Sequence, residues 1–172
     1  MNAVPTLLEA RVQRSFAEVA DQHLDAVYRY LVFLTGDRAA AEDLTGETFE
    51  RALRWWRRYD PRRSSPRTWL CRIARSAALD HFRAEERRRR REESYARELP
   101  EEGELAFGEG FSAELERALG TLTPGEREVV ALRVVLDLDG PAAARVLRIS
   151  ETACSTRLSR ALKKLEEAMR DV

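Results

Sequence analysis

A stretch near the middle of the chain interrupts two longer stretches of helical apolar periodicity. Residues 92–111, EESYARELPEEGELAFGEGF, hold one proline, three glycines and many acidic side chains, and no sustained apolar period runs through them. This composition is typical of a linker, because it cannot bury enough apolar surface to order itself. For a chain of 172 residues we therefore predict two small domains, at 1–92 and 112–172, joined by a flexible linker at 93–111.

The first half predicts a bundle of three or four helices. Over 16–34 apolar residues recur every three or four positions, which is the period of an α-helix. Gly36 predicts the end of this helix, and Asp37 predicts a cap for the next one, expected over 38–58. Pro66 suits the first turn of a third helix that continues into the arginine-rich run.

The second half predicts four helices, at 112–120, 124–136, about 139–147 and 150–170, and no strand is indicated there. We therefore predict an all-α fold. The segment GPAAARVLRIS, which ends at Ser150, indicates a short helix and a tight turn before the last helix, as in a helix-turn-helix. Ser150 is a good N-cap, and Glu151 places an acid where the helix dipole favours one.

The last predicted helix has two distinct sides. Its packing side comprises Cys154, Leu158, Ala161, Leu162 and Leu165, and its outer side comprises Thr152, Thr156, Ser159, Arg160 and Lys163. Hydroxyl and basic side chains together suit contacts with DNA bases and phosphates. An ordinary amphipathic helix with a solvated basic side is about as well supported by this segment alone.

Charge is unevenly distributed along a chain whose formal net charge is zero. Residues 51–97 hold 16 Lys or Arg against 6 Asp or Glu, a net charge of +10, whereas 1–50 carry −5 and 98–128 carry −7. A polyanion would meet the local basic field, because distant charges are screened at physiological salt. The run EERRRRREE suits a DNA backbone, and a solvated charge block on a fraying helix fits it about equally.

The loop DPRRSSPRT lies between aromatic residues in the sequence. We expect Trp55, Trp56 and Trp69 to belong to the core, because indoles carry a large apolar area. The loop is basic and rich in hydroxyls, and beside aromatic rings it suits an unstacked base of single-stranded DNA.

The helix expected over 38–58 leaves an acidic side outside the core. That side comprises Asp43, Gly46, Glu47, Glu50, Leu53 and Arg57. An apolar residue among acids suits a protein partner better than DNA, and a plain solvated side is about as well supported by the spacing.

The sequence indicates no catalytic, metal or cofactor site. His23 and His81 have no arranged Ser, Cys or carboxylate partners, and no glycine loop is suited to phosphate. Cys71 and Cys154 lie far apart, so we predict neither a disulfide nor a zinc site, but two small core residues in a reducing cytosol. We expect no export leader and no membrane span, since no run of about 18 apolar residues occurs.

Four motifs, in order, resemble the extracytoplasmic-function sigma factors, the short two-domain initiation factors of bacterial RNA polymerase. They are AEDLTGETFERALRWW, YDPRRSSPRTWLCRIARSAALDHFR, LTPGEREVVALRVVLDLDG and LRISETACSTRLSRALKKL, and they cover nearly the whole chain. The resemblance implies a cytoplasmic, non-enzymatic protein whose partners are core RNA polymerase and promoter DNA. The first domain would grip the polymerase clamp helices and open the minus-ten element. The second would meet the polymerase flap and read the minus-thirty-five element, and the family's usual further partner is an anti-sigma factor.

The resemblance also implies site residues, position by position. The polymerase-binding residues would be Asp43, Glu47, Glu50 and Leu53. The minus-ten residues would be Arg62, Arg63, Ser64, Ser65, Arg67, Arg72, Arg75, Ser76, Arg83, Arg87 and Arg88. The minus-thirty-five residues would be Thr152, Ser155, Thr156, Arg157, Ser159, Arg160 and Lys163.

The chain departs from the family pattern at four of its positions. Gly46 stands where Gln is usual, and Ser76 stands where Asn is usual. Arg148 replaces the usual turn glycine, and Ser155 replaces a common Lys. The segment DLDGPAAARVL also lacks the usual acidic-Ile-Ala signature.

Two other functions fit parts of the sequence. A stand-alone operator-binding regulator would use the helix-turn-helix and leave the N-terminal pattern unexplained. A helical adaptor that binds only protein would use the acidic side of the second helix and ignore the basic half.

Overall fold

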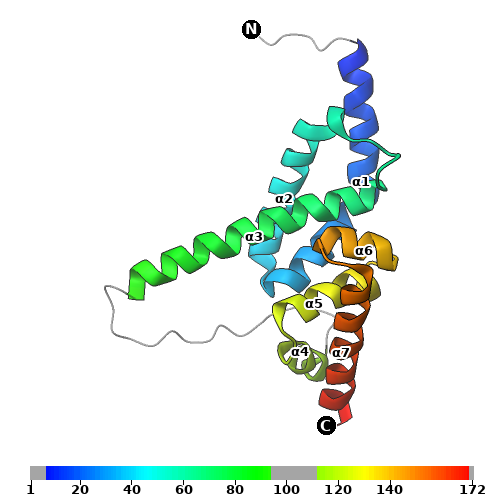
Figure 1. Ribbon diagram of the computed structural model, residues 1–172. Helices are drawn as coiled ribbons and strands as arrows, with labels where there is room; N and C mark the ends of the chain where they lie inside the picture. The colour runs from blue at the N-terminus through cyan, green and yellow to red at the C-terminus, as the bar shows by residue number, and fades with distance from the viewer. Residues whose placement is uncertain (1–6, 94–111, 171–172) are drawn as a thin grey trace.

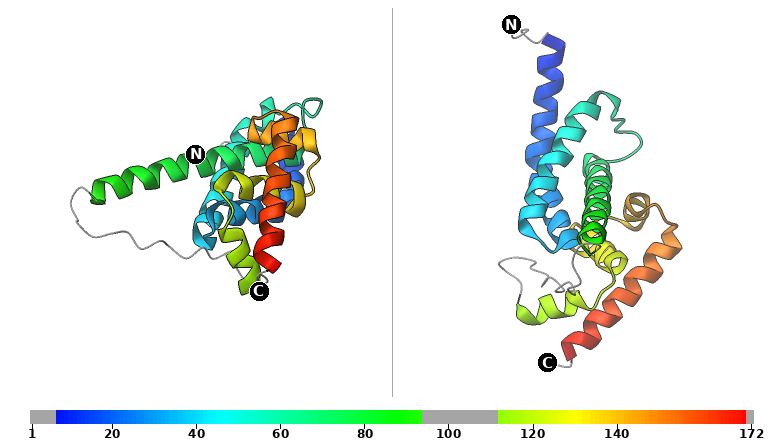
Figure 2. Two further views of the ribbon diagram at one scale, coloured as in Figure 1. Left: turned by 60° about the horizontal axis from the view of Figure 1, so that its bottom comes forward. Right: turned by 90° about the vertical axis from the view of Figure 1, so that its left-hand side faces the viewer.

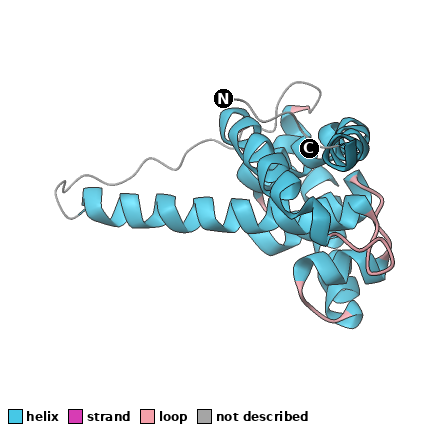
Figure 3. Cartoon of the chain, turned by 90° about the horizontal axis from the view of Figure 1, so that it is seen from above, coloured by secondary structure: helices cyan, strands magenta, loops and turns pink. Residues whose placement is uncertain are grey.

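The computed structural model describes residues 7–93 and 112–170, with side chains from Phe16 to Glu92 and from Ser112 to Arg170. Every regular element in these two ranges is a helix (Figure 3), which confirms the predicted all-α fold. The predicted linker lies almost wholly outside the described residues.

Three helices form the N-terminal part of the molecule, namely α1 (Leu7–Thr35), α2 (Arg38–Trp55) and α3 (Pro66–Glu93). Each packs against the other two (Figure 1). Gly36 follows α1 with a φ of 64°, a conformation that glycine adopts at little cost. Asp37 then caps α2, because its carboxylate accepts a hydrogen bond from the Ala40 N–H at 3.2 Å. The predicted stop and cap are confirmed.

The core of this part draws apolar side chains from all three helices. Tyr30, Leu31 and Leu70 are fully buried in it, and Trp56 and Trp69 pack against it as predicted. Trp55, however, is 43% exposed. Adjacent helical residues point about 100° apart, and here Trp56 takes the inward direction while Trp55 points to solvent. A short 3-10 turn, η1 (Trp56–Arg58), then leads to the loop before α3.

Four helices form the C-terminal part, namely α4 (Ala113–Gly120), α5 (Pro124–Val130), α6 (Gly140–Leu147) and α7 (Glu151–Arg170). The helix predicted over 124–136 is present, but it widens after α5 into a π-helical turn, η2 (Ala131–Val135). In that turn the Leu136 N–H donates to the Ala131 carbonyl oxygen at 2.9 Å. Ser150 caps α7 as predicted, accepting from the Ala153 N–H at 3.1 Å.

A tight turn joins α6 to α7, as predicted. Arg148 ends α6 in the left-handed conformation, with a φ of 56°. The Ile149 N–H then donates to the Ala144 carbonyl oxygen at 3.1 Å. A residue with a side chain adopts this conformation at a cost that glycine avoids. The order and connection of α6 and α7 are those of a helix-turn-helix.

Glu126 ties α7 to the start of α5. Its carboxylate accepts hydrogen bonds from the Thr123 N–H at 2.9 Å and from the Lys164 ammonium at 2.8 Å. The hydrogen bond from Lys164, followed by those from Thr123, lowers the Glu126 pKa from 4.5 to about 2. The ionised carboxylate therefore stabilises the fold above about pH 4.5, and this contribution is lost as the pH falls towards 2.

We expect Glu126→Gln to lower the free energy of unfolding by about 1–2 kcal/mol at pH 7, because the charge-assisted bond to Lys164 is lost. The difference in unfolding free energy between the variant and the wild type should shrink as the pH falls from about 4.5 towards 2. Urea unfolding followed by far-UV circular dichroism measures both effects. Glu167→Gln, which removes an exposed pair with Lys163 at 3.7 Å, is the control and should change stability far less. A deficit independent of pH would contradict the assignment.

The two groups of helices pack against each other. α6 lies against α3, and α1 lies against α5 and η2 (Figure 1). The right-hand view of Figure 2 looks nearly along α3 and shows α6 beside it. Nothing in the sequence predicted this contact, which bears directly on the candidate DNA-binding residues of α3.

Candidate polymerase and nucleic-acid interfaces

The acidic surface of α2 consists of Asp43, Glu47, Glu50 and Leu53. All four side chains are exposed, whereas the opposite side of the helix is buried in the core. Leu53 is 46% exposed, and an apolar side chain so placed among carboxylates suits burial by a protein partner.

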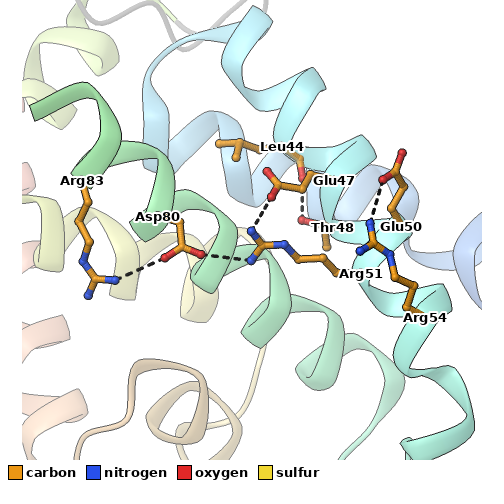
Figure 4. Close-up of polar contacts among 8 residues, drawn as sticks. All are labelled: Leu44, Glu47, Thr48, Glu50, Arg51, Arg54, Asp80 and Arg83. Carbon is orange, nitrogen blue, oxygen red and sulfur yellow. Dashed lines mark hydrogen bonds and ion pairs between the residues drawn. The ribbon is translucent and has the colours of Figure 1, made fainter. Parts of the chain in front are cut away.

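Ion pairs hold part of this surface in place (Figure 4). Glu47 pairs with Arg51, whose guanidinium also donates to Asp80 of α3 at 3.2 Å. Asp80 in turn pairs with Arg83 at 3.4 Å. Exposed pairs contribute little to stability one by one, but this chain of pairs links α2 to α3 and fixes the direction of the Glu47 carboxylate.

The loop between η1 and α3 is ordered by its own hydrogen bonds. The Tyr59 hydroxyl donates to the Ser64 carbonyl oxygen at 2.8 Å, and Asp60 accepts from the Arg62 N–H at 2.9 Å. The side chains of Arg62 and Arg63 remain exposed. Because the loop is already ordered, less entropy is lost when its side chains bind a base or a phosphate.

Three aromatic rings cluster at the two ends of this loop. Trp56 stacks on Tyr59 with the ring centroids 5.1 Å apart, and Tyr59 lies 4.9 Å from Trp69. All three are partly buried. These rings therefore pack mainly on one another and stiffen the loop, which leaves the exposed arginines as its contact groups. Ser64 is partly buried, and the Ser65 hydroxyl accepts from the Thr68 N–H at 3.2 Å at the start of α3.

The face of α3 that was predicted to meet the minus-ten element is divided. Arg72 and Ser76 are exposed. In contrast, the Arg75 guanidinium donates to the Glu128 carboxylate at 2.7 Å, and Arg67 donates to the Leu136 carbonyl oxygen at 2.8 Å. Both acceptors belong to the C-terminal part, Glu128 in α5 and Leu136 just after η2. In this conformation Arg67 and Arg75 are occupied.

The arginine run forms the far end of α3, which projects beyond the other helices (Figure 1). Its side chains pair along the helix, Arg88 with Glu85 at 2.8 Å and Arg89 with Glu86 at 2.9 Å. Pairs at this spacing stabilise a helix by a few tenths of a kcal/mol each. The predicted contacts Arg83, Arg87 and Arg88 are therefore exposed, on a helix whose own acids offset part of their charge.

The outer side of α7 is exposed as predicted. The residues exposed there are Thr152, Ser155, Thr156, Ser159, Arg160 and Lys163. On the packing side Cys154 and Ala161 are buried, and Leu158 and Leu165 are partly buried. Leu162 is 44% exposed, so its prediction was wrong. It follows Ala161, which takes the inward direction, and so points about 100° away from the core.

Arg157 lies over α5 instead of on the outer side of α7. A Cβ added to Gly125 would come within 3.3 Å of Arg157 Nη1, so the glycine leaves room for the guanidinium. Arg157 is half-buried there. A contact between Arg157 and DNA would require its side chain to turn away from α5.

Glu128 contacts a candidate minus-ten residue, Arg75, but the sequence did not single out Glu128, because it is one acid among many in 98–128. Its side chain is 8% exposed and accepts from the Tyr30 hydroxyl at 2.8 Å as well as from Arg75. Burial, and then the nearby Glu128 carboxylate, raise the Tyr30 pKa well above its ordinary value, so the phenol keeps the proton that it donates. Glu128 thereby joins α5 to both α1 and α3.

Two family models match the chain in order, Sigma-70 region 2 over 19–88 and Sigma-70, region 4 over 112–165. The chain is 35% identical over 161 residues to the ECF RNA polymerase sigma factor BldN of Streptomyces coelicolor, a match that covers 91% of this chain and 61% of BldN. It is 30% identical over 168 residues to the ECF RNA polymerase sigma factor SigX of Bacillus subtilis, covering 92% of this chain and 85% of SigX. The chain belongs to the extracytoplasmic-function sigma factors.

Solved structures share the fold of this sigma factor. The structure of CnrH in complex with the cytosolic domain of CnrY is 25% identical with a TM-score of 0.67, and the match covers 92% of this chain and 90% of CnrH. The sigma factor RpoE of Bartonella quintana, solved with the anti-sigma factor NepR, has a TM-score of 0.74 at 22% identity, covering 91% and 98% of the two chains. The second likeness shows the fold alone.

The site residues predicted for this sigma factor all fall within the matched ranges. Those for polymerase and the minus-ten element lie between Asp43 and Arg88, inside the region 2 match. Those for the minus-thirty-five element lie between Thr152 and Lys163, inside the region 4 match. Their individual roles stay predictions.

The cysteines of this sigma factor are core residues, as predicted. Cys71 and Cys154 are both buried and free, and burial raises the Cys71 pKa to about 12, so its thiol stays protonated. Within 7–93 and 112–170 no three His, Cys, Asp or Glu side chains are grouped to hold a metal ion. The helices in these ranges are too short or too polar to cross a membrane.

Proposed function

We propose that this sigma factor binds core RNA polymerase and directs it to promoters, reading the minus-thirty-five element and opening the minus-ten element. The proposal rests above all on the presence in one chain of both sigma-70 regions, each with an exposed face of suitable chemistry. Its domains would be 1–92 and 112–172, with a linker at 93–111. The chain would act by binding, without a catalytic step, in the cytoplasm.

The acidic surface of α2 is the proposed site for the clamp helices of the polymerase. Leu53 supplies the apolar anchor, and the surrounding carboxylates favour a basic partner and disfavour DNA. The ion pairs from Glu47 to α3 keep the surface rigid, which lowers the entropy lost on association.

The loop before α3 is the proposed site for an unstacked base of the minus-ten element. Arg62 and Arg63 would neutralise phosphates, and the hydroxyls of Ser64 and Ser65 would bond base edges, Ser65 in addition to its contact with Thr68. Arg72 and Ser76 in the first half of α3 would continue this path along the strand. Farther along the helix the proposed contacts are the exposed Arg83, Arg87 and Arg88.

The outer side of α7 is the proposed reader of the minus-thirty-five element. It follows α6 through a tight turn, so it is the second helix of the motif and the one that enters the major groove. Thr152, Ser155 and Thr156 lie near its N-terminus, where such helices meet base edges, and Arg160 and Lys163 follow on the same side.

We expect Arg160→Ala to weaken use of promoters that depend on the minus-thirty-five element by about 1–3 kcal/mol, if the contact is bidentate to a base. Run-off transcription from promoters with and without that element measures the change. Arg170→Ala is the matched control, because Arg170 is exposed near the end of the same helix and pairs with Glu166. Unchanged promoter selectivity would remove Arg160 from the site.

Co-elution from a size-exclusion column tests the polymerase half of the proposal. The purified chain should co-elute with core RNA polymerase. Binding to DNA with no binding to polymerase would instead favour a stand-alone operator-binding regulator, and binding to polymerase with no effect on promoter use would favour a protein-only adaptor.

An anti-sigma factor is a further proposed partner, because the related CnrH and RpoE were each solved with a partner bound. A cleft of about 530 Å³ lies between the two groups of helices in this chain. Its apolar lining residues include Leu34, Ala78, Leu79 and Phe82, and its charged ones are Arg75, Arg127, Glu128 and Arg157. Such a lining suits the apolar face of a helix.

A further inference from the structure

We propose that the free chain inhibits its own binding to DNA. The Glu128 carboxylate binds Arg75 at the position where a promoter phosphate would bind. The inference rests on the proposed function, since it requires that Arg75 serve the minus-ten element. It concerns the conformation described above, in which α3 packs against α6 and α1 packs against α5.

The Glu128 contact has the chemistry of a phosphate contact. Arg75 Nε donates to Glu128 Oε1 at 2.7 Å, and Arg75 Nη2 faces Oε2 at 3.5 Å. Guanidinium groups bind carboxylates and phosphates through the same paired donors. The Nε and Nη2 donors engaged in this way cannot bind a phosphate at the same time, so a paired contact of these donors with DNA and the pairing with Glu128 exclude each other.

The Arg75–Glu128 pair is largely buried. The side chain of Glu128 is 8% exposed and that of Arg75 is 20% exposed, and the Tyr30 hydroxyl satisfies the carboxylate further at 2.8 Å. A buried charge left without its partner is costly, so opening requires solvent or DNA to reach both groups. Tyr30 has no proposed contact with DNA or polymerase. A substitution of Tyr30 therefore perturbs the Glu128 contact without removing a proposed binding residue.

A second arginine is occupied in the same way. Arg67 donates to the Leu136 carbonyl oxygen at 2.8 Å, just after the π-helical turn η2. Arg67 and Arg75 lie about two helical turns apart on α3, and each is bonded to the C-terminal part of the chain. The closed form therefore occupies two of the proposed minus-ten arginines, whereas Arg72 and Ser76 stay exposed on the same helix.

The closed form also brings like charges together. Arg148 of α6 shares a small cleft with Arg72, Arg75, Ser76 and Arg83 of α3. Arginines that converge in this way repel one another, which opposes closure. Glu128 is the carboxylate bonded to this group from the C-terminal helices, so its negative charge offsets the repulsion. Closure should then depend strongly on this single acid.

Separation of the two groups of helices would raise the apparent affinity of the chain for DNA, because a larger fraction of the molecules could bind it. A binding-competent form that is only partly populated lowers the apparent affinity in proportion to its population. Polymerase binding that favours separated regions would relieve the inhibition in the same way. The device would keep the free chain from occupying DNA before it meets the polymerase.

Glu128→Gln in the full chain tests the proposal, because the amide keeps the shape of the side chain and removes its charge. Glu114→Gln is the control for the lost charge, since Glu114 is exposed on α4. Small-angle X-ray scattering reports opening, and fluorescence anisotropy with a labelled mixed-sequence single-stranded 20-mer reports DNA affinity. Tyr30→Phe, which loses only the hydroxyl, should show the same changes more weakly. Circular dichroism checks that each variant is folded.

We expect Glu128→Gln to raise the radius of gyration by about 5 Å, the increase for two domains released on a linker of this length. It should bind the 20-mer about tenfold more tightly than Glu114→Gln, the gain expected if about nine-tenths of the wild-type molecules are closed. An unchanged radius of gyration overturns the claim that Glu128 holds the chain closed. A larger radius with no gain over the control overturns the role of Glu128 as a stand-in for phosphate.

The self-inhibition and the proposed function can be contradicted independently of each other. Scattering and 20-mer binding use the chain alone, so they test self-inhibition whether or not polymerase binds. Transcription by wild-type chain with core polymerase tests the proposed function whether or not Glu128 matters.

Discussion

Leu53→Asp is expected to weaken the binding of core RNA polymerase by about 2–4 kcal/mol, roughly 30- to 1000-fold in affinity. Leu53 is 46% exposed and is the apolar member of the acidic surface, so it is the side chain there that a partner gains most by burying. Aspartate would instead place an unpaired carboxylate in a desolvated contact, beside other acids. Titration of the labelled chain with core polymerase, followed by fluorescence anisotropy, measures the affinity.

Leu24→Asp is the matched control for this variant. Leu24 is 51% exposed on α1 and lies outside the acidic surface, so the substitution should leave polymerase binding as in wild type. If Leu53→Asp bound polymerase with wild-type affinity, the acidic surface of α2 would not be the polymerase site.

Replacement of both Arg62 and Arg63 by alanine is expected to slow promoter opening by about 30-fold or more, since each lost charge-assisted contact is worth about 1 kcal/mol or more. The loop should keep its shape, because Asp60 accepts from the main-chain N–H of Arg62 and the Tyr59 hydroxyl donates to the Ser64 carbonyl oxygen. Permanganate reactivity of the minus-ten thymines over time measures opening by the holoenzyme.

Arg91→Ala provides the comparison, because Arg91 is exposed near the end of α3 and is not among the proposed minus-ten residues. It should open the promoter at close to the wild-type rate. Equal rates for the double variant and for Arg91→Ala would show that the loop does not hold the strand.

The helix ends could be predicted because capping is local. Asp37 and Ser150 each satisfy an N–H three residues ahead, so a short stretch of sequence contains both partners. The same holds for Gly36, whose positive φ suits the residue type. The outer side of α7 was predictable for a similar reason, since the angular positions of its residues follow from helix geometry.

The directions of Trp55 and Leu162 were not predictable from periodicity. Each lies beside a residue that takes the inward direction, Trp56 and Ala161 respectively. Apolar character alone does not decide which of two neighbours faces the core, because that choice depends on how much room the facing helix leaves.

The contact of Glu128 with Tyr30 and Arg75 could not be predicted, because its partners are 98 and 53 residues away. No local pattern encodes a pairing between elements so far apart in the chain. The sequence marked Arg67 and Arg75 as candidate DNA contacts by their motif, but their occupation by C-terminal groups depends on how the two regions pack.

Transcription by purified core RNA polymerase on fragmented genomic DNA, with and without this chain, tests the central claim most directly. The proposed function predicts that the chain makes the polymerase start at discrete sites, each preceded by a shared pair of elements near minus ten and minus thirty-five, and that polymerase alone does not. Binding of the chain to DNA, with no association with polymerase and no discrete start sites, would contradict it.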